Sequence, residues 1–123
     1  MTLDEFQSSL QALTPPTELS LALQGLWHDA KGDWNAAHEC AQNQDDAEGA
    51  WVHAYLHREE GDAANAAYWY RRANRPVAQQ TLEKEWEEIA QALLQYAQMY
   101  SFQVSQRARA APPVGAEQPF TTT

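Results

Sequence analysis

The stretch that most constrains this chain is residues 51–76, WVHAYLHREEGDAANAAYWYRRANRP, which has the pattern of two helices joined by a tight turn. Apolar residues recur at helical spacing through residue 60, and a second segment, 63–73, is rich in alanine and aromatic residues. Between them, Gly61 has the permissive backbone that commonly ends a helix. Asp62 follows, and its carboxylate can accept hydrogen bonds from the free N–H groups of the next helix. The stretch therefore predicts a helical hairpin.

The same 3.6-residue spacing of apolar side chains recurs along most of the chain. It predicts six helices, over about residues 3–13, 18–31, 34–42, 47–60, 63–73 and 82–102. Each is preceded by residues able to cap it: Thr2 with Glu5 in a capping box, Thr17, Asp33, Asp46, Asp62 and Thr81. The first turns of the last helix carry four glutamates, which we expect to form a solvated face: Glu83, Glu85, Glu87 and Glu88.

The predicted helices form one domain. A chain of 123 residues is long enough for a single core and too short for two comfortable ones. We assign residues 1–103 to this all-α domain. Residues 104–123 have no apolar period, three prolines and many small residues, so we expect a flexible C-terminal tail.

Charge and composition exclude several classes of protein. The net charge of −9 argues against a nucleic-acid surface, which needs clustered basic residues. No apolar run approaches the roughly 20 residues of a membrane span, and the N-terminus MTLDEFQSSL lacks the pattern of a secretory signal. The single cysteine, Cys40, excludes an internal disulfide and is typical of a reducing compartment. We therefore expect a cytoplasmic protein that binds neither nucleic acid nor membrane.

An offset of 29 residues places one predicted hairpin on another. It brings the pair Gly32-Asp33 onto Gly61-Asp62, and His28 onto His57. A helix–turn–helix period of this size indicates a helical repeat.

The second hairpin resembles the tetratricopeptide and Sel1-like repeats. Residues 61–73, GDAANAAYWYRRA, are similar to the turn and second helix of those families, with Ala66, Tyr70 and Ala73 at the small, large and small packing positions. The resemblance covers about residues 18–76 and implies two degenerate repeats, flanked by a short N-terminal helix and a long C-terminal helix. The helical period places Trp51 on the inner stripe of its helix, so we expect this residue to belong to the core. More broadly, WHDAKGDW, AWVHAYLHREEGD and YWYRRA resemble a group of small bacterial proteins of unknown function.

Four histidines raise the question of a metal site. His53 and His57 are spaced i, i+4 on one ridge of their helix, and His28 or His38 could supply a third ligand to a divalent ion. The alternative is that each imidazole bonds a helix end or a carboxylate. Because His28 and His57 occupy equivalent places in the repeat, we favour a structural role. We therefore expect no bound metal and no pocket shared by the four imidazoles.

Arginine is concentrated in one part of the chain. Four of the eight basic residues lie between residues 58 and 75, beside aromatic residues. Arginine and aromatic side chains grouped in this way can bind a carboxylate or phosphate on a partner. The alternative is a solvated face that pairs with neighbouring glutamates. The residues predicted to contact a partner are Arg58, Tyr68, Trp69, Arg71, Arg72 and Arg75.

No catalytic motif accompanies these groups. The sequence contains no glycine-rich phosphate loop and no GxSxG motif, and we expect Cys40 to be a structural thiol. We therefore predict a non-enzymatic helical-repeat protein without a cofactor, which binds another protein or peptide of acidic character. The alternatives are a histidine-based metal-binding protein or small metalloenzyme, and a homo-oligomer that buries surplus aromatic residues.

Overall fold

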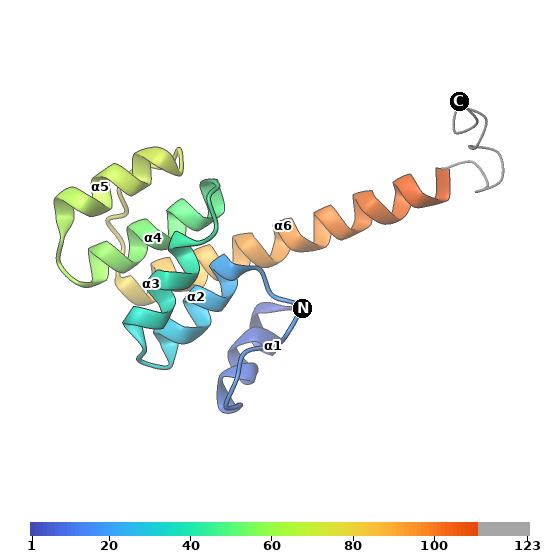
Figure 1. Ribbon diagram of the computed structural model, residues 1–123, viewed down its shortest axis with the longest axis horizontal. Coiled ribbons are helices and arrows are strands. Elements are labelled where there is room, and N and C mark those ends of the chain that lie inside the picture. Colours follow the sequence, from blue (N-terminus) through green and yellow to red (C-terminus); the bar gives the residue numbers. More distant parts are fainter. Residues whose placement is uncertain (111–123) are drawn as a thin grey trace, which may run out of the picture.

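The computed structural model describes residues 1–110, which form six α-helices and one short 3-10 helix (Figure 1). In chain order these are α1 (Leu3–Ser8), η1 (Ser9–Gln11), α2 (Leu21–Ala30), α3 (Trp34–Gln42), α4 (Ala47–Glu59), α5 (Ala63–Arg72) and α6 (Leu82–Ala110). No strand occurs among the described residues. The predicted all-α class is confirmed, whereas the likeness of α2–α3 and α4–α5 to tetratricopeptide or Sel1-like repeats stays a prediction.

Local capping fixes most of the helix starts, as predicted. The carboxylates of Asp33, Asp46 and Asp62 each accept a hydrogen bond from the backbone N–H three residues on, at 3.0, 2.9 and 3.2 Å. The two turns before Asp33 and Asp62 contain Gly32 and Gly61, whose φ angles of 86° and 88° are readily adopted only by glycine. These short-range bonds satisfy N–H groups that the helices themselves leave free.

The predicted start of α2 is wrong. The helix begins at Leu21, and its cap is Ser20, which accepts a hydrogen bond from Leu23 N; Thr17 does not cap it. A second bond holds this end, because Ala22 N donates to Gln44 Oε1 at 2.7 Å from the turn between α3 and α4. The start of α2 is thus held by a local cap at Ser20 and by a tertiary bond to Gln44, and the second of these is not visible in the local sequence pattern.

The predicted end of the last helix is also wrong. Instead of ending near Phe102, α6 continues through Ala110. Residues 103–110 contain no proline or glycine, so nothing in the sequence breaks the helix there. Residues 104–110 of the predicted tail are thus helical, and residues 111–123 lie outside the described residues.

The core is built around α4. Every residue from Gly49 to His57 is buried, and α4 contacts α2, α3, α5 and α6. Trp51 and Ala66 are buried, as predicted for the second hairpin. At the other end of the core, Phe6 of α1 stacks on Trp86 of α6 with ring centroids 5.6 Å apart.

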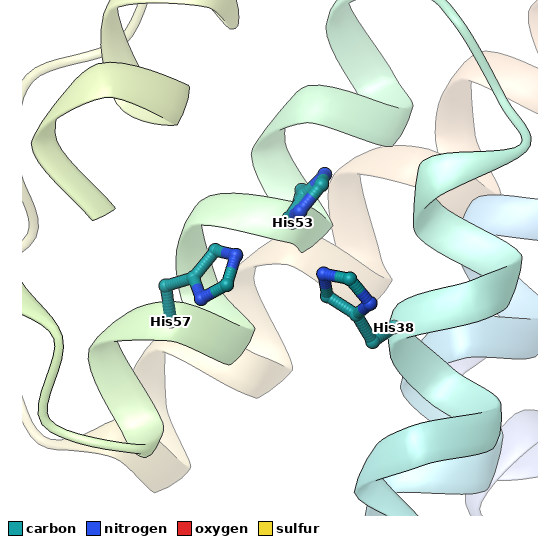
Figure 2. Close-up of side chains that lie close together, drawn as sticks. All are labelled: His38, His53 and His57. Atoms are coloured by element: carbon teal, nitrogen blue, oxygen red, sulfur yellow. The ribbon is translucent and has the colours of Figure 1, made fainter. Parts of the chain in front are cut away.

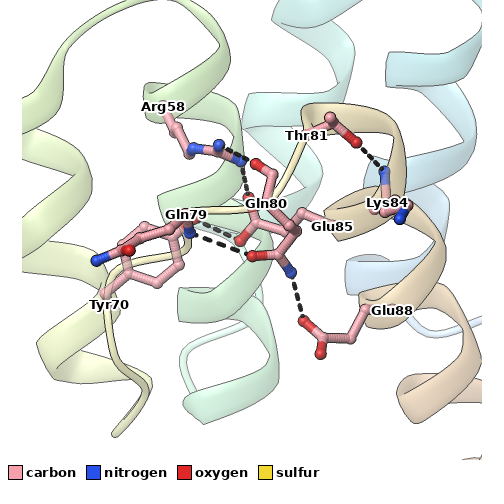
Figure 3. A network of polar contacts seen from close by, with 8 residues as sticks. All are labelled: Arg58, Tyr70, Gln79, Gln80, Thr81, Lys84, Glu85 and Glu88. Atoms are coloured by element: carbon pink, nitrogen blue, oxygen red, sulfur yellow. Dashed lines mark hydrogen bonds and ion pairs between the residues drawn. The ribbon is translucent and has the colours of Figure 1, made fainter.

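A buried carboxylate joins three segments of the fold (Figure 3). Glu85 of α6 is 1% exposed, so the expectation that it belongs to a solvated face is wrong. Its carboxylate accepts hydrogen bonds from Arg58 Nη1 of α4, at 2.8 Å, and from Tyr70 Oη of α5. Burial and the bond to Glu85 raise the pKa of Tyr70, which keeps its hydroxyl proton available for donation.

The two halves of α6 differ in their surroundings. Residues up to Leu94 pack against the other helices, whereas the remainder projects away from them (Figure 1). Within the described part of the chain, no helix combines the length and the apolar character needed to cross a membrane.

Candidate functional site

The projecting half of α6 carries large apolar side chains in solvent. Their exposed fractions run from 39% for Tyr96 to 70% for Tyr100, and the set comprises Tyr96, Met99, Tyr100, Phe102 and Val104. Scattered exposed apolar residues are ordinary, but a group of large ones on one element is typical of an interaction surface.

Part of this group continues the stripe that faces the core. At 100° per residue, Tyr96, Tyr100 and Val104 fall on the same side of α6 as buried Ile89 and Leu93. The apolar pattern of the core-facing side of α6 thus continues into the segment that projects beyond the other helices. We call Tyr96, Ala97, Tyr100 and Val104 the α6 stripe. The sequence shows the period as far as Tyr100, but only the fold shows that its last part is uncovered.

A groove lies at the base of the projecting segment. It has a volume of about 470 Å³ and is bordered by Met1, residues 16–20, Leu23, and Leu94, Ala97, Gln98 and Ser101 of α6. Gln98 Nε2 donates to the backbone oxygen of Met1 at 2.9 Å, which ties the N-terminus to this helix. The α6 stripe therefore adjoins a concave surface.

The structure divides the predicted arginine group. Arg58 is engaged in the buried ion pair with Glu85. Arg75 lies over the ring of Trp51, 3.7 Å from its centroid, and its Nη2 donates to Tyr96 Oη at 3.0 Å. Both guanidinium groups are occupied within the protein, which leaves fewer arginines for a partner than the sequence suggests.

Three of the predicted contact residues do lie together on the outside of α5. Tyr68, Arg71 and Arg72 are exposed, and both guanidinium groups lie about 6 Å from the Tyr68 ring centroid, at 6.0 and 5.8 Å. Arg72 also approaches exposed Asp45 at 3.7 Å. Trp69, in contrast, is half-buried against His53.

Three of the four histidines converge between α3 and α4 (Figure 2). His38 comes from α3, and His53 and His57 come from adjacent turns of α4. One nitrogen of each imidazole lies within 4.8 Å of the other two. The sequence predicts no pocket shared by all four imidazoles, but the packing of α3 on α4 brings His38 next to the i, i+4 pair. His28 lies apart, edge-on to Trp27 at 5.3 Å.

Two tryptophans enclose this group, which we call the histidine cluster. Trp34 stacks on His38 with centroids 4.9 Å apart, and Trp69 stacks on His53 at 3.8 Å. The indole N–H of Trp34 donates to the Leu56 oxygen at 2.9 Å, which joins α3 to α4 beside the cluster. The rings are therefore held by stacking from both α3 and α5.

Burial and mutual proximity keep two of the imidazoles neutral. Burial, together with His38 and His57, lowers the pKa of His53 to about 4. Burial and His57 likewise lower the pKa of His38. His38 and His53 thus present imidazole lone pairs at neutral pH. The Nδ1 of His57 lies 2.7 Å from Glu60 Oε2, an exposed carboxylate one turn further along the chain.

Cys40 shows no sign of activation. The thiol is half-buried, and burial with the nearby charge of Glu39 raises its pKa. The thiolate is the nucleophilic form, so a raised pKa lowers reactivity at neutral pH.

Comparisons of this chain with models of protein families, with curated proteins and with solved structures find no match.

Proposed function

We propose that this chain is a non-enzymatic interaction module that binds another protein through the α6 stripe and the adjoining groove. One observation carries the proposal: an apolar, aromatic-rich stripe continues along the part of α6 that projects beyond the other helices. Aromatic residues and methionine are enriched at protein interfaces, and full burial of one such side chain contributes about 1.5–3 kcal/mol. The resemblance to tetratricopeptide and Sel1-like repeats supports the same function by analogy of fold.

The charge of this segment indicates the chemistry of the partner. The chain carries a net charge of −9, yet no acidic residue occurs in the 89–110 segment, which contains Arg107 and Arg109. An apolar, weakly basic helix is suited to an apolar groove rimmed by acidic residues, a known mode of helix recognition. We therefore propose an acidic partner that receives the projecting helix.

A pair of charge-matched variants tests this proposal. In the first, Tyr100→Asp and Val104→Asp place two charges on the α6 stripe. In the control, Gln95→Asp and Ser105→Asp add the same charge at exposed positions on other sides of the helix. Quantitative pull-down from the source cell should show capture of a partner by the parent and the control, and loss of capture by the stripe variant.

Equal capture by both variants would contradict the proposal. Circular dichroism of both should match the parent, since all four positions are exposed. Light scattering of the purified proteins distinguishes a different partner protein from a second copy of this chain. If the parent and the control variant are dimers and the stripe variant is a monomer, a second copy occupies the surface.

The arginine face of α5 stays a separate prediction. If Tyr68, Arg71 and Arg72 contact an acidic partner, the double change Arg71→Ala and Arg72→Ala should abolish capture without altering the circular dichroism. Capture by the parent should then also weaken with added salt, because exposed charges are screened.

A further inference from the structure

The histidine cluster has features that aromatic packing alone does not require. Three imidazole nitrogens from two helices lie within 4.8 Å of one another, and two of the rings, His53 and His57, are almost fully buried. Within residues 1–110, neither the imidazole of His38 nor that of His53 forms a hydrogen bond with another protein group, and no buried side-chain nitrogen lacks a partner, so the free ring nitrogens of these two residues reach solvent. Imidazole nitrogens from two helices that lie this close together are suited to bind one metal ion.

We propose that His38, His53 and His57 bind one divalent transition-metal ion, with Zn²⁺ as the reference ion, and that a fourth position remains for water or an external ligand. This inference goes beyond the proposed interaction and does not depend on it. Three protein ligands and one open position are the usual arrangement of a reactive zinc site, whereas a structural zinc site normally has four.

To close around an ion, the ring nitrogens would have to approach one another by at most about 1.5 Å. Tetrahedral zinc with bonds of about 2.0–2.1 Å holds its nitrogen ligands about 3.3 Å apart. Two imidazoles spaced i, i+4 on α4 already face the same side of the helix. His38 is the half-buried member, so its side chain has the most freedom to move inward.

Glu60 prepares His57 for this role. The 2.7 Å contact with Glu60 Oε2 engages Nδ1 of His57, which as an N–H donor leaves Nε2 with its lone pair free. Histidines that bind metals commonly donate their other N–H to a carboxylate, which fixes the tautomer and strengthens the ligand. We therefore infer that Nε2 of His57 faces the ion and that Glu60 is a positioning residue.

The three imidazole ligands also limit which metal ions the site can bind. Imidazole favours Zn²⁺, Cu²⁺, Ni²⁺ and Co²⁺, whereas Mg²⁺ and Ca²⁺ prefer oxygen ligands. The stacked tryptophans, Trp34 and Trp69, supply an apolar wall that limits water around the site. Mg²⁺ is therefore the appropriate negative control.

The test uses the full chain, produced without a polyhistidine tag, stripped with a chelator and titrated with Zn²⁺ by calorimetry. We expect one Zn²⁺ per chain with a dissociation constant below about 10 μM. Titration with Co²⁺ should give the visible d–d bands of a four-coordinate ion, and Mg²⁺ should not bind.

Four variants assign the ligands. His38→Ala and His53→Phe should each weaken Zn²⁺ binding by more than about 100-fold, and Glu60→Gln by about 10-fold, because Glu60 acts through His57. His28→Ala removes the histidine outside the cluster and should leave the affinity within about twofold. Zn²⁺ should raise the melting temperature of the parent and of His28→Ala, but not of His38→Ala.

Several results would overturn the proposal. They are an absence of Zn²⁺ binding by the parent at this affinity, unchanged binding by His38→Ala, or an equal loss in His28→Ala. His38→Ala changes the least buried ligand and should keep the circular dichroism of the parent, so its loss of binding would not reflect unfolding. Any of these failures would leave the proposed protein interaction unaffected, because the α6 stripe contains no histidine.

Discussion

Replacing Glu85 with alanine should lower the free energy of unfolding by about 3–5 kcal/mol, because it breaks a buried ion pair and leaves one partner uncompensated. The carboxylate is 1% exposed and holds α4, α5 and α6 together through Arg58 and Tyr70. Without it, the Arg58 guanidinium remains in a site where its side chain is only 23% exposed.

The magnitude has two sources. The larger is the loss of the counter-charge of Arg58, which also donates to the backbone oxygen of Gln80 and is thereby held in place. The smaller is the Tyr70 hydroxyl, whose loss of an acceptor costs about 1–3 kcal/mol. Glu85→Gln keeps the shape and one acceptor oxygen, so it should cost about 1–3 kcal/mol, less than the alanine change.

Urea unfolding, followed by tryptophan fluorescence and circular dichroism, measures these differences. Glu88→Ala is the matched control: Glu88 is an exposed carboxylate on the same helix and accepts a hydrogen bond from Gln80 Nε2 at 3.0 Å. It should change stability by no more than about 0.5 kcal/mol. If Glu85→Ala also remained within about 1 kcal/mol of the parent, the carboxylate could not be the buried junction of three helices.

Three further predictions test other parts of the fold. Gly49→Ala should cost about 3 kcal/mol or more in thermal melts, because a Cβ there would lie 1.9 Å from the backbone oxygen of Gln44; a melt like the parent's would contradict the close approach of that turn. In the metal-free folded chain the pKa of His53 is about 4, against an ordinary value of 6.5. On acidification the unfolded state therefore binds a proton at this residue before the folded state does. The free energy of unfolding should consequently fall by at most about 3 kcal/mol between pH 6.5 and pH 4. His53→Phe should lose this dependence in urea melts at the two pH values. Removing residues 104–123 should lower the melting temperature by less than about 8 °C, since residues 104–107 are exposed.

The sequence predicts best those features that depend on nearby residues. Each of Asp33, Asp46 and Asp62 caps a helix through an N–H only three residues away, so the pattern contains the whole interaction. The burial of Trp51 follows equally from the helical period. These local rules suffice to place six helices and their class.

Features that depend on residues distant in sequence cannot be predicted from capping and helical periodicity. Gln44 accepts a hydrogen bond from the first turn of α2, and Arg58 pairs with buried Glu85, each from a position more than 20 residues away. A row of glutamates at a helix N-terminus is favourable in solvent, so residue type does not distinguish Glu85 from the other glutamates. Its place one turn before buried Ile89 puts it on the core-facing side of α6, but only the partner helices supply the Arg58 and Tyr70 groups that make its burial possible.

The histidines show how repeat symmetry can mislead about side chains. The equivalence of His28 and His57 is real for the backbone, because their carbonyl oxygens accept bonds from Asp33 N and Asp62 N, both at 2.9 Å. That structural role uses the main chain and is open to almost any residue. The imidazoles have different surroundings: His28 lies edge-on to Trp27, whereas His57 is bonded to Glu60 and faces His38 and His53. Backbone capping therefore explains why the two histidines occupy corresponding places before each Gly-Asp turn, but it does not account for the convergence of the three imidazoles, for which we propose a shared metal ion.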